Sequence, residues 1–143
     1  MFVSIAFYTL SLFLIYFDCK KYVVPNELIL TLFVFVILFG FFNSTLTMYN
    51  LLMPIALVFL FWFISKLNLG YIGGGDIKYL LIIAIYLEPL AFALFLVLSG
   101  LLQLLFLVFY KKIKKRRFAP MVPAMVLAVA FTEIAYMIGV YPL

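Results

Sequence analysis

Six apolar segments separated by short polar stretches dominate this chain of 143 residues. The chain is 70% apolar and 10% charged, whereas soluble domains are roughly 45–50% apolar. A soluble protein of this length has too little interior to bury so many apolar side chains. The pattern therefore predicts an all-α integral membrane protein, a bundle of six transmembrane helices. The segments are residues 2–17, 28–42, 51–65, 77–87, 89–110 and 121–140.

The fourth segment is too short to cross a membrane by itself. As a helix, residues 77–87 reach only about 16 Å, roughly half of the hydrocarbon thickness. We expect this crossing to include or closely follow residues 67–75, which brings Asp76 to the membrane edge. A single helix over the fourth and fifth segments is disfavoured by Glu88-Pro89, because the residue before a proline is pushed out of the helical region.

The distribution of charge predicts the orientation. With six crossings and the N-terminus outside, all ten basic residues fall on one side of the membrane. The positive-inside rule makes that side cytoplasmic. We found no internal repeat and no low-complexity linker, so residues 1–143 are expected to form a single membrane-embedded domain. The basic residues are Lys20, Lys21, Lys66, Lys78, Lys111, Lys112, Lys114, Lys115, Arg116 and Arg117.

Few side chains are available for chemistry. One cysteine and no histidine exclude a disulfide framework and a histidine or cysteine metal site, so we expect no metal and no cofactor. In the orientation above, Asp18, Glu27 and Asp76 lie at cytoplasmic helix ends, where two aspartates can meet. Glu133 lies within the last apolar segment, and it is either a hydrogen-bonded structural acid or a support for the site.

Gly73, Gly74 and Gly75 directly precede Asp76. Three consecutive glycines lose about 1 kcal/mol each in helix propensity, so they are unusual in a membrane helix. Glycine permits unusual backbone angles and the close approach of another chain, such as a peptide substrate. Lys78 either lowers the pKa of the nearby acid or marks the cytoplasmic border, and the sequence leaves both readings open.

A second motif joins the first two segments. Asp18 ends the first helix, and Pro25-Asn26 opens the second. Proline suits the first turn of a helix, and asparagine can cap a helix or form a local hydrogen bond.

These two motifs resemble the type IV prepilin peptidases and archaeal preflagellin peptidases. Asp18 is followed eight positions later by the asparagine of Val-Pro-Asn, and Gly-Gly-Gly-Asp-Ile-Lys occupies residues 73–78. A looser third match is Phe118-Ala-Pro-Met-Val-Pro-Ala, before the last helix. The resemblance implies that Asp18 and Asp76 are catalytic. Substrate or backbone support would come from Gly73, Gly74, Gly75, Lys78, Pro25 and Asn26.

The resemblance also implies an activity. It is that of an aspartic endopeptidase in the cytoplasmic membrane of a bacterium or archaeon, which removes the leader peptide from prepilin-like precursors. The substrate would carry a basic leader and an apolar helix. Membrane lipids are the other expected partner, and no nucleic acid is expected. Larger family members also methylate the new N-terminus and carry a loop with paired cysteines, so for this chain we expect cleavage without methylation.

Three other readings compete with this one. The chain could be a non-enzymatic scaffold or assembly factor of a pilus or secretion system, in which the glycines pack helices and the acids are structural. A small transporter is disfavoured, because it would need polar groups near the bilayer midplane. A presenilin-like protease would share the glycine-aspartate motif alone and lack the Pro25-Asn26 context.

Overall fold

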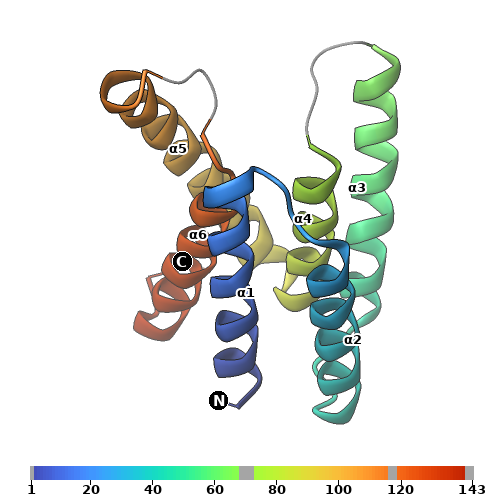
Figure 1. The fold of residues 1–143 in the computed structure, drawn as a ribbon. Coiled ribbons are helices and arrows are strands. Elements are labelled where there is room, and N and C mark those ends of the chain that lie inside the picture. Colours follow the sequence, from blue (N-terminus) through green and yellow to red (C-terminus); the bar gives the residue numbers. More distant parts are fainter. Residues whose placement is uncertain (1, 68–72, 116–118, 141–143) are drawn as a thin grey trace.

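The structure is a computed structural model that describes residues 2–67, 73–115 and 119–140. Within these ranges the chain forms six helices, as predicted (Figure 1). The break at Glu88-Pro89 is confirmed, because α4 ends before Glu88 and α5 begins at Pro89. The helices are α1 (Phe2–Lys21), α2 (Asn26–Phe42), α3 (Met48–Lys66), α4 (Gly74–Tyr86), α5 (Pro89–Ile113) and α6 (Val122–Ile138).

Three of these helices are long and apolar enough to cross a membrane. They are α1, α3 and α5, with 20, 19 and 25 residues. At 1.5 Å per residue their lengths are about 28 to 38 Å, which matches a hydrocarbon core of about 30 Å. The apolar helices α2 and α6 are shorter, with 17 residues each.

The fourth helix begins at the end of the stretch 67–75, which it was expected to include or closely follow. Leu67 terminates α3, and the 13 residues of α4 start at Gly74, so α4 is about 20 Å long. Residues 68–72, where an earlier start was expected, lie outside the described ranges. Asp76 is therefore in the first turn of α4.

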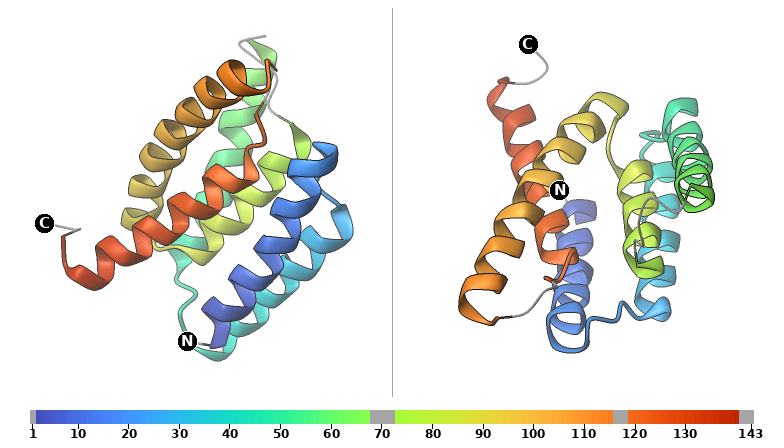
Figure 2. Two further views of the ribbon diagram at one scale, coloured as in Figure 1. Left: turned by 60° about the vertical axis from the view of Figure 1, so that its left-hand side comes forward. Right: turned by 90° about the horizontal axis from the view of Figure 1, so that it is seen from above.

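Helix α4 is the centre of the bundle. It packs against α2, α3, α5 and α6 (Figure 2). Its Tyr79 side chain also reaches α1. This central position explains why its apolar side chains are almost all buried, whereas many of those on α3 are exposed, as expected for a surface that faces lipid. The buried side chains of α4 are Tyr79, Leu80, Ile82, Ile83, Ala84 and Ile85.

Consecutive helices run in opposite directions along the bundle (Figure 1). The ends of α1, α3 and α5 therefore lie on the same side as the beginnings of α2, α4 and α6. We call this side the basic end, because it carries the lysines of the described residues. Those lysines are Lys20, Lys21, Lys66, Lys78, Lys111, Lys112, Lys114 and Lys115.

Candidate active site

Polar contacts between α1 and α4 repeat every seven residues. The Tyr79 hydroxyl donates to the Ser11 hydroxyl oxygen at 2.9 Å, and the hydroxyls of Tyr86 and Ser4 form a hydrogen bond at 3.3 Å. The Tyr86 ring also stacks on Phe7 of α1, with ring centroids 4.2 Å apart. Seven residues are close to two helical turns, so these pairs define an antiparallel register of the two helices.

This register brings the two aspartates to the same region of the basic end. Asp18 lies seven residues beyond Ser11, about 10 Å along α1, and Asp76 lies three residues before Tyr79, about 4.5 Å along α4. The axial offset between the two aspartates is therefore only about 6 Å. Because Cα–Cβ bonds tilt toward the N-terminus of their own helix, in an antiparallel pair these two side chains lean toward each other.

Asp18 is held by the beginning of α6. Its side chain is only 5% exposed. One carboxylate oxygen, Oδ2, accepts a hydrogen bond from the backbone N–H of Val122 at 3.0 Å. The backbone donor supplies a polar partner for an acid that is otherwise cut off from water.

Asp76 lies in the first turn of α4, and its side chain is half-buried. Its Oδ2 folds back over Gly73, where an added Cβ would be 3.0 Å away. Asp18 is near enough for its negative charge to act on the Asp76 carboxyl. The two carboxyls are thus close enough to influence each other's ionisation.

The glycines before Asp76 have ordinary backbone angles. The expectation of unusual backbone angles at these glycines was therefore wrong. Gly73 has φ −59° and ψ 134°, and Gly74 and Gly75 are helical. The expected close approach occurs at Gly75, where an added Cβ would be 2.8 Å from the Cβ of Val24. The chain that approaches is therefore the protein's own segment between α1 and α2.

The beginnings of α2 and α4 are joined by a hydrogen bond between Lys78 and Asn26, and Pro25 lies directly before α2. The Lys78 ammonium donates to the side-chain oxygen of Asn26 at 2.9 Å. Asn26 was expected to cap α2 or to bond locally, but α2 has no side-chain cap and the partner of Asn26 is on α4. Pro25 precedes the first turn of α2 instead of lying within it, with an extended ψ of 128°.

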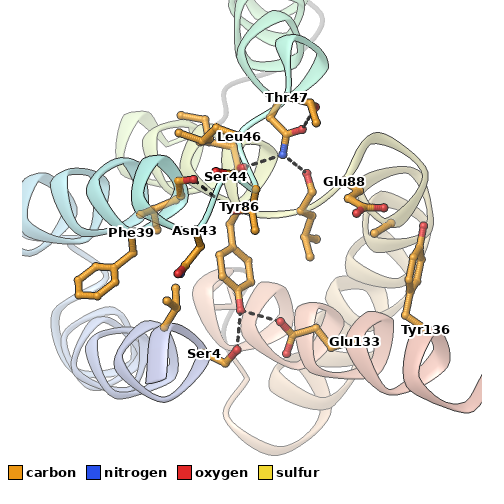
Figure 3. A pocket seen from close by; sticks show the side chains of 18 of the residues that line it. Ser4, Phe39, Asn43, Ser44, Leu46, Thr47, Tyr86, Glu88, Glu133 and Tyr136 are labelled. Atoms are coloured by element: carbon orange, nitrogen blue, oxygen red, sulfur yellow. Dashed lines mark hydrogen bonds between the residues drawn. The ribbon is translucent and has the colours of Figure 1, made fainter. Parts of the chain in front are cut away.

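A pocket of about 740 Å³ lies at the other end of the bundle (Figure 3). Glu133 of α6 lines it, and its carboxylate accepts hydrogen bonds from the hydroxyls of Tyr86, at 2.7 Å, and of Tyr8. Neither aspartate lines this pocket. These contacts favour the reading of Glu133 as a hydrogen-bonded structural acid. Sequence reasoning missed Tyr8 and Tyr86 as the partners of Glu133. It also missed the contacts between α1 and α4, although the seven-residue spacing of Tyr79 and Tyr86 matches that of Ser4 and Ser11.

No metal centre is evident in the described part of the chain. Within residues 2–67, 73–115 and 119–140, no group of three or more histidine, cysteine, aspartate or glutamate side chains is arranged as metal ligands.

A helical membrane bundle with two neighbouring aspartates at one end has the architecture of a membrane aspartic peptidase. The chain belongs to the type IV leader peptidase family, whose pattern it matches over residues 5–108. This confirms the resemblance seen in the sequence. No curated protein and no solved structure matches the chain.

Family membership establishes the activity. The protein is an aspartic endopeptidase of the cytoplasmic membrane that removes leader peptides from prepilins. It is therefore an enzyme, and the scaffold reading is not supported. The matched range contains Asp18, Asp76 and the glycine motif, and it ends within α5, before α6 begins.

Proposed function

We propose that Asp18 and Asp76 are the catalytic pair of this peptidase. The observation that carries the proposal is the seven-residue register of α1 and α4, which aligns the two carboxyls at the basic end. The effect of the Asp18 charge on Asp76 supports it. Two neighbouring carboxyls do not both ionise easily, so the pair shares one proton.

The singly protonated pair can hydrolyse a peptide bond with water alone. The ionised carboxylate takes a proton from water, and the hydroxide so formed adds to the scissile carbonyl carbon. The protonated carboxyl gives its proton to the carbonyl oxygen, which yields a neutral tetrahedral diol. When the diol collapses, the C–N bond breaks and the leaving nitrogen takes the proton that the first carboxylate had accepted. One diol hydroxyl returns its proton to the second carboxylate, which leaves a carboxylic acid product and restores the singly protonated pair.

The neighbouring residues of the motifs have supporting roles in this proposal. Gly75 lets the segment around Val24 pack against α4, and Gly73 leaves room for the Asp76 carboxyl. The hydrogen bond from Lys78 to Asn26 ties α2 to α4 directly beside the site, where Pro25 sets the direction of the chain. Gly74 has open space around it and no assigned contact.

We further propose that the chain crosses the membrane six times, with the N-terminus outside and the basic end cytoplasmic. All ten Lys and Arg residues then lie on the cytoplasmic side, as the positive-inside rule requires. A substrate with a basic leader and an apolar helix would present its cleavage site to the aspartates at this border. Cleavage is proposed to occur without methylation of the new N-terminus.

The test is leader removal from a prepilin of the same genome, co-expressed in membranes and followed by a gel shift. The variants are Asp18→Asn and Asp76→Asn, with Glu88→Gln as the matched control because Glu88 is an exposed acid at the opposite end. Both aspartate variants should lose nearly all cleavage at equal expression, whereas Glu88→Gln should cleave like the wild type. Mass spectrometry of the product reports methylation directly.

Normal cleavage by either asparagine variant would show that the pair is wrong. A methylated product would overturn the second part of the proposal and leave the pair intact.

A further inference from the structure

The beginning of α6 lacks a cap of its own. Its N-cap residue, Met121, makes no side-chain capping hydrogen bond. The first N–H groups of a helix have no partner within the helix, and they carry partial positive charge. One of them, the N–H of Val122, points at the Asp18 carboxylate at 3.0 Å.

Asp18 therefore caps α6 from another helix, across 104 positions of the sequence. Both partners are shielded from water, since Asp18 is 5% exposed and Val122 is 0% exposed. A backbone donor can give a hydrogen bond to a carboxylate, and it stabilises the ionised form over the protonated form. A negative charge at a helix N-terminus is stabilised by the helix dipole, which also favours the ionised form of Asp18.

We propose that the N-terminus of α6 positions Asp18 and holds it as the ionised member of the catalytic pair, so that Asp18 is the base and Asp76 is the acid. This inference rests on the proposed function, in which these two residues are the pair. It goes beyond the family match, because α6 lies outside the matched range. Val122 thus acts through Asp18 as a positioning residue, by way of its backbone.

The surroundings of Asp76 support the complementary role. Its carboxyl is half-buried in the first turn of α4, folded over Gly73. Burial disfavours the charged form of both carboxyls, and the Val122 N–H offsets this cost at Asp18, so the proton of the pair is assigned to Asp76.

The chain offers an isotope label confined to the site, because Asp18 and Asp76 are its only aspartates. Aspartate labelled with ¹³C at the side-chain carboxyl gives two NMR signals, whose shifts distinguish ionised from protonated carboxyls. The enzyme is made by cell-free synthesis into lipid nanodiscs, with residue 122 replaced by the α-hydroxy analogue of valine. This backbone ester removes the Val122 N–H and keeps the side chain.

The matched control is a backbone ester at Met125. The N–H of Met125 donates to the Met121 carbonyl at 3.1 Å. The ester at 122 weakens this same bond by making that carbonyl an ester carbonyl, so the control removes the helix bond and retains the donor to Asp18.

The ester at 122 should move one carboxyl signal, that of Asp18, and this signal should be the ionised one. It should also lower kcat about tenfold or more with little change in KM, because a hydrogen bond to a charged group is lost. The Met125 ester should do neither. Asp18→Asn, in the same assay, should be inactive.

Each of the other possible results would overturn a defined part of the proposal. If the signal that moves is the protonated one, the roles of base and acid are reversed. If the two esters give the same kcat and the same spectra, α6 does not position Asp18. If Asp18→Asn cleaves normally, the proposed pair itself fails, which is distinct from the failure of the α6 contact alone.

Discussion

Gly74 and Gly75 are adjacent at the residue scale, yet their surroundings differ. An added Cβ at Gly75 would lie 2.8 Å from the Val24 Cβ, closer than real side chains pack, whereas nothing lies within 4 Å of the same atom at Gly74. Both residues are helical, so conformational preference does not separate them. The difference between them is therefore one of space alone, and it can be tested with the same substitution at both sites.

We predict that Gly75→Ala reduces leader removal about 10- to 100-fold, because displacement by about 1 Å at a catalytic group has effects of this size. Gly74→Ala should cleave within about twofold of the wild type, since alanine gains roughly 1 kcal/mol in helix propensity without a clash. The measurement is the initial rate of prepilin cleavage per folded enzyme in nanodiscs. Equal rates for the two variants would contradict the role given to Val24.

Val24→Gly supplies a second control for the clash. It removes the atom that an alanine at position 75 would meet. Combined with Gly75→Ala, it should restore a substantial part of the lost rate. No recovery would mean that Gly75 matters for another reason.

At the scale of the element, the two ends of α4 are held by different helices. Its beginning is joined to α2 by Lys78 and Asn26. Its end is held by Asn50 in the first turn of α3, whose side chain is 3% exposed. The Asn50 amide donates to the carbonyls of Ile85 and Leu87 at 3.0 and 3.3 Å. These carbonyls are among those that a helix end leaves without an internal partner.

We predict that Asn50→Leu lowers the free energy of unfolding by about 1–3 kcal/mol, because two buried carbonyls lose their donor. Asn43→Leu, at an exposed asparagine near the same end, should change it by less than about 0.5 kcal/mol. Unfolding of the purified protein by SDS, followed by circular dichroism, measures both. Equal stability of the two variants would show that Asn50 does not hold α4.

At the scale of the whole molecule, a polar network and the catalytic pair occupy opposite ends of the same helices. Glu133 of α6 forms hydrogen bonds with Tyr86 of α4, which also bonds Ser4 (Figure 3). Glu133 also accepts a hydrogen bond from Tyr8 of α1. The network thus joins α1, α4 and α6. The same three helices supply, in this order, Asp18, Asp76 and the Val122 N–H that binds Asp18. The contribution of the network should be to stability and not to chemistry.

We predict that Glu133→Leu lowers stability by about 1–3 kcal/mol, because the two tyrosine hydroxyls lose their acceptor. Cleavage per folded molecule should remain within about twofold, since the network does not reach the aspartates. SDS unfolding and prepilin cleavage are measured on the same preparation. A tenfold loss of cleavage at unchanged stability would instead give Glu133 a role in the site.

The orientation of the molecule is tested by labelling with a membrane-impermeant maleimide. In a Cys19→Ser background, Glu88→Cys and Lys112→Cys place single thiols at opposite ends of the bundle, both at exposed positions. With the basic end cytoplasmic, intact cells should label Glu88→Cys, and Lys112→Cys should label only after permeabilisation. The reverse pattern would show that the chain is inverted.

Local signals in the sequence predicted the six helices, the break at Glu88-Pro89 and the motifs around Asp18 and Asp76. Apolar segments, prolines and glycine motifs are local signals, because they act through the preferences of neighbouring residues. The contacts of the motif residues, in contrast, are set by tertiary packing. Lys78 bonds Asn26, Gly75 accommodates Val24, and Asp18 caps α6, and each of these partners lies on a different helix or loop. Such pairs depend on helix packing and register, which a single sequence does not specify.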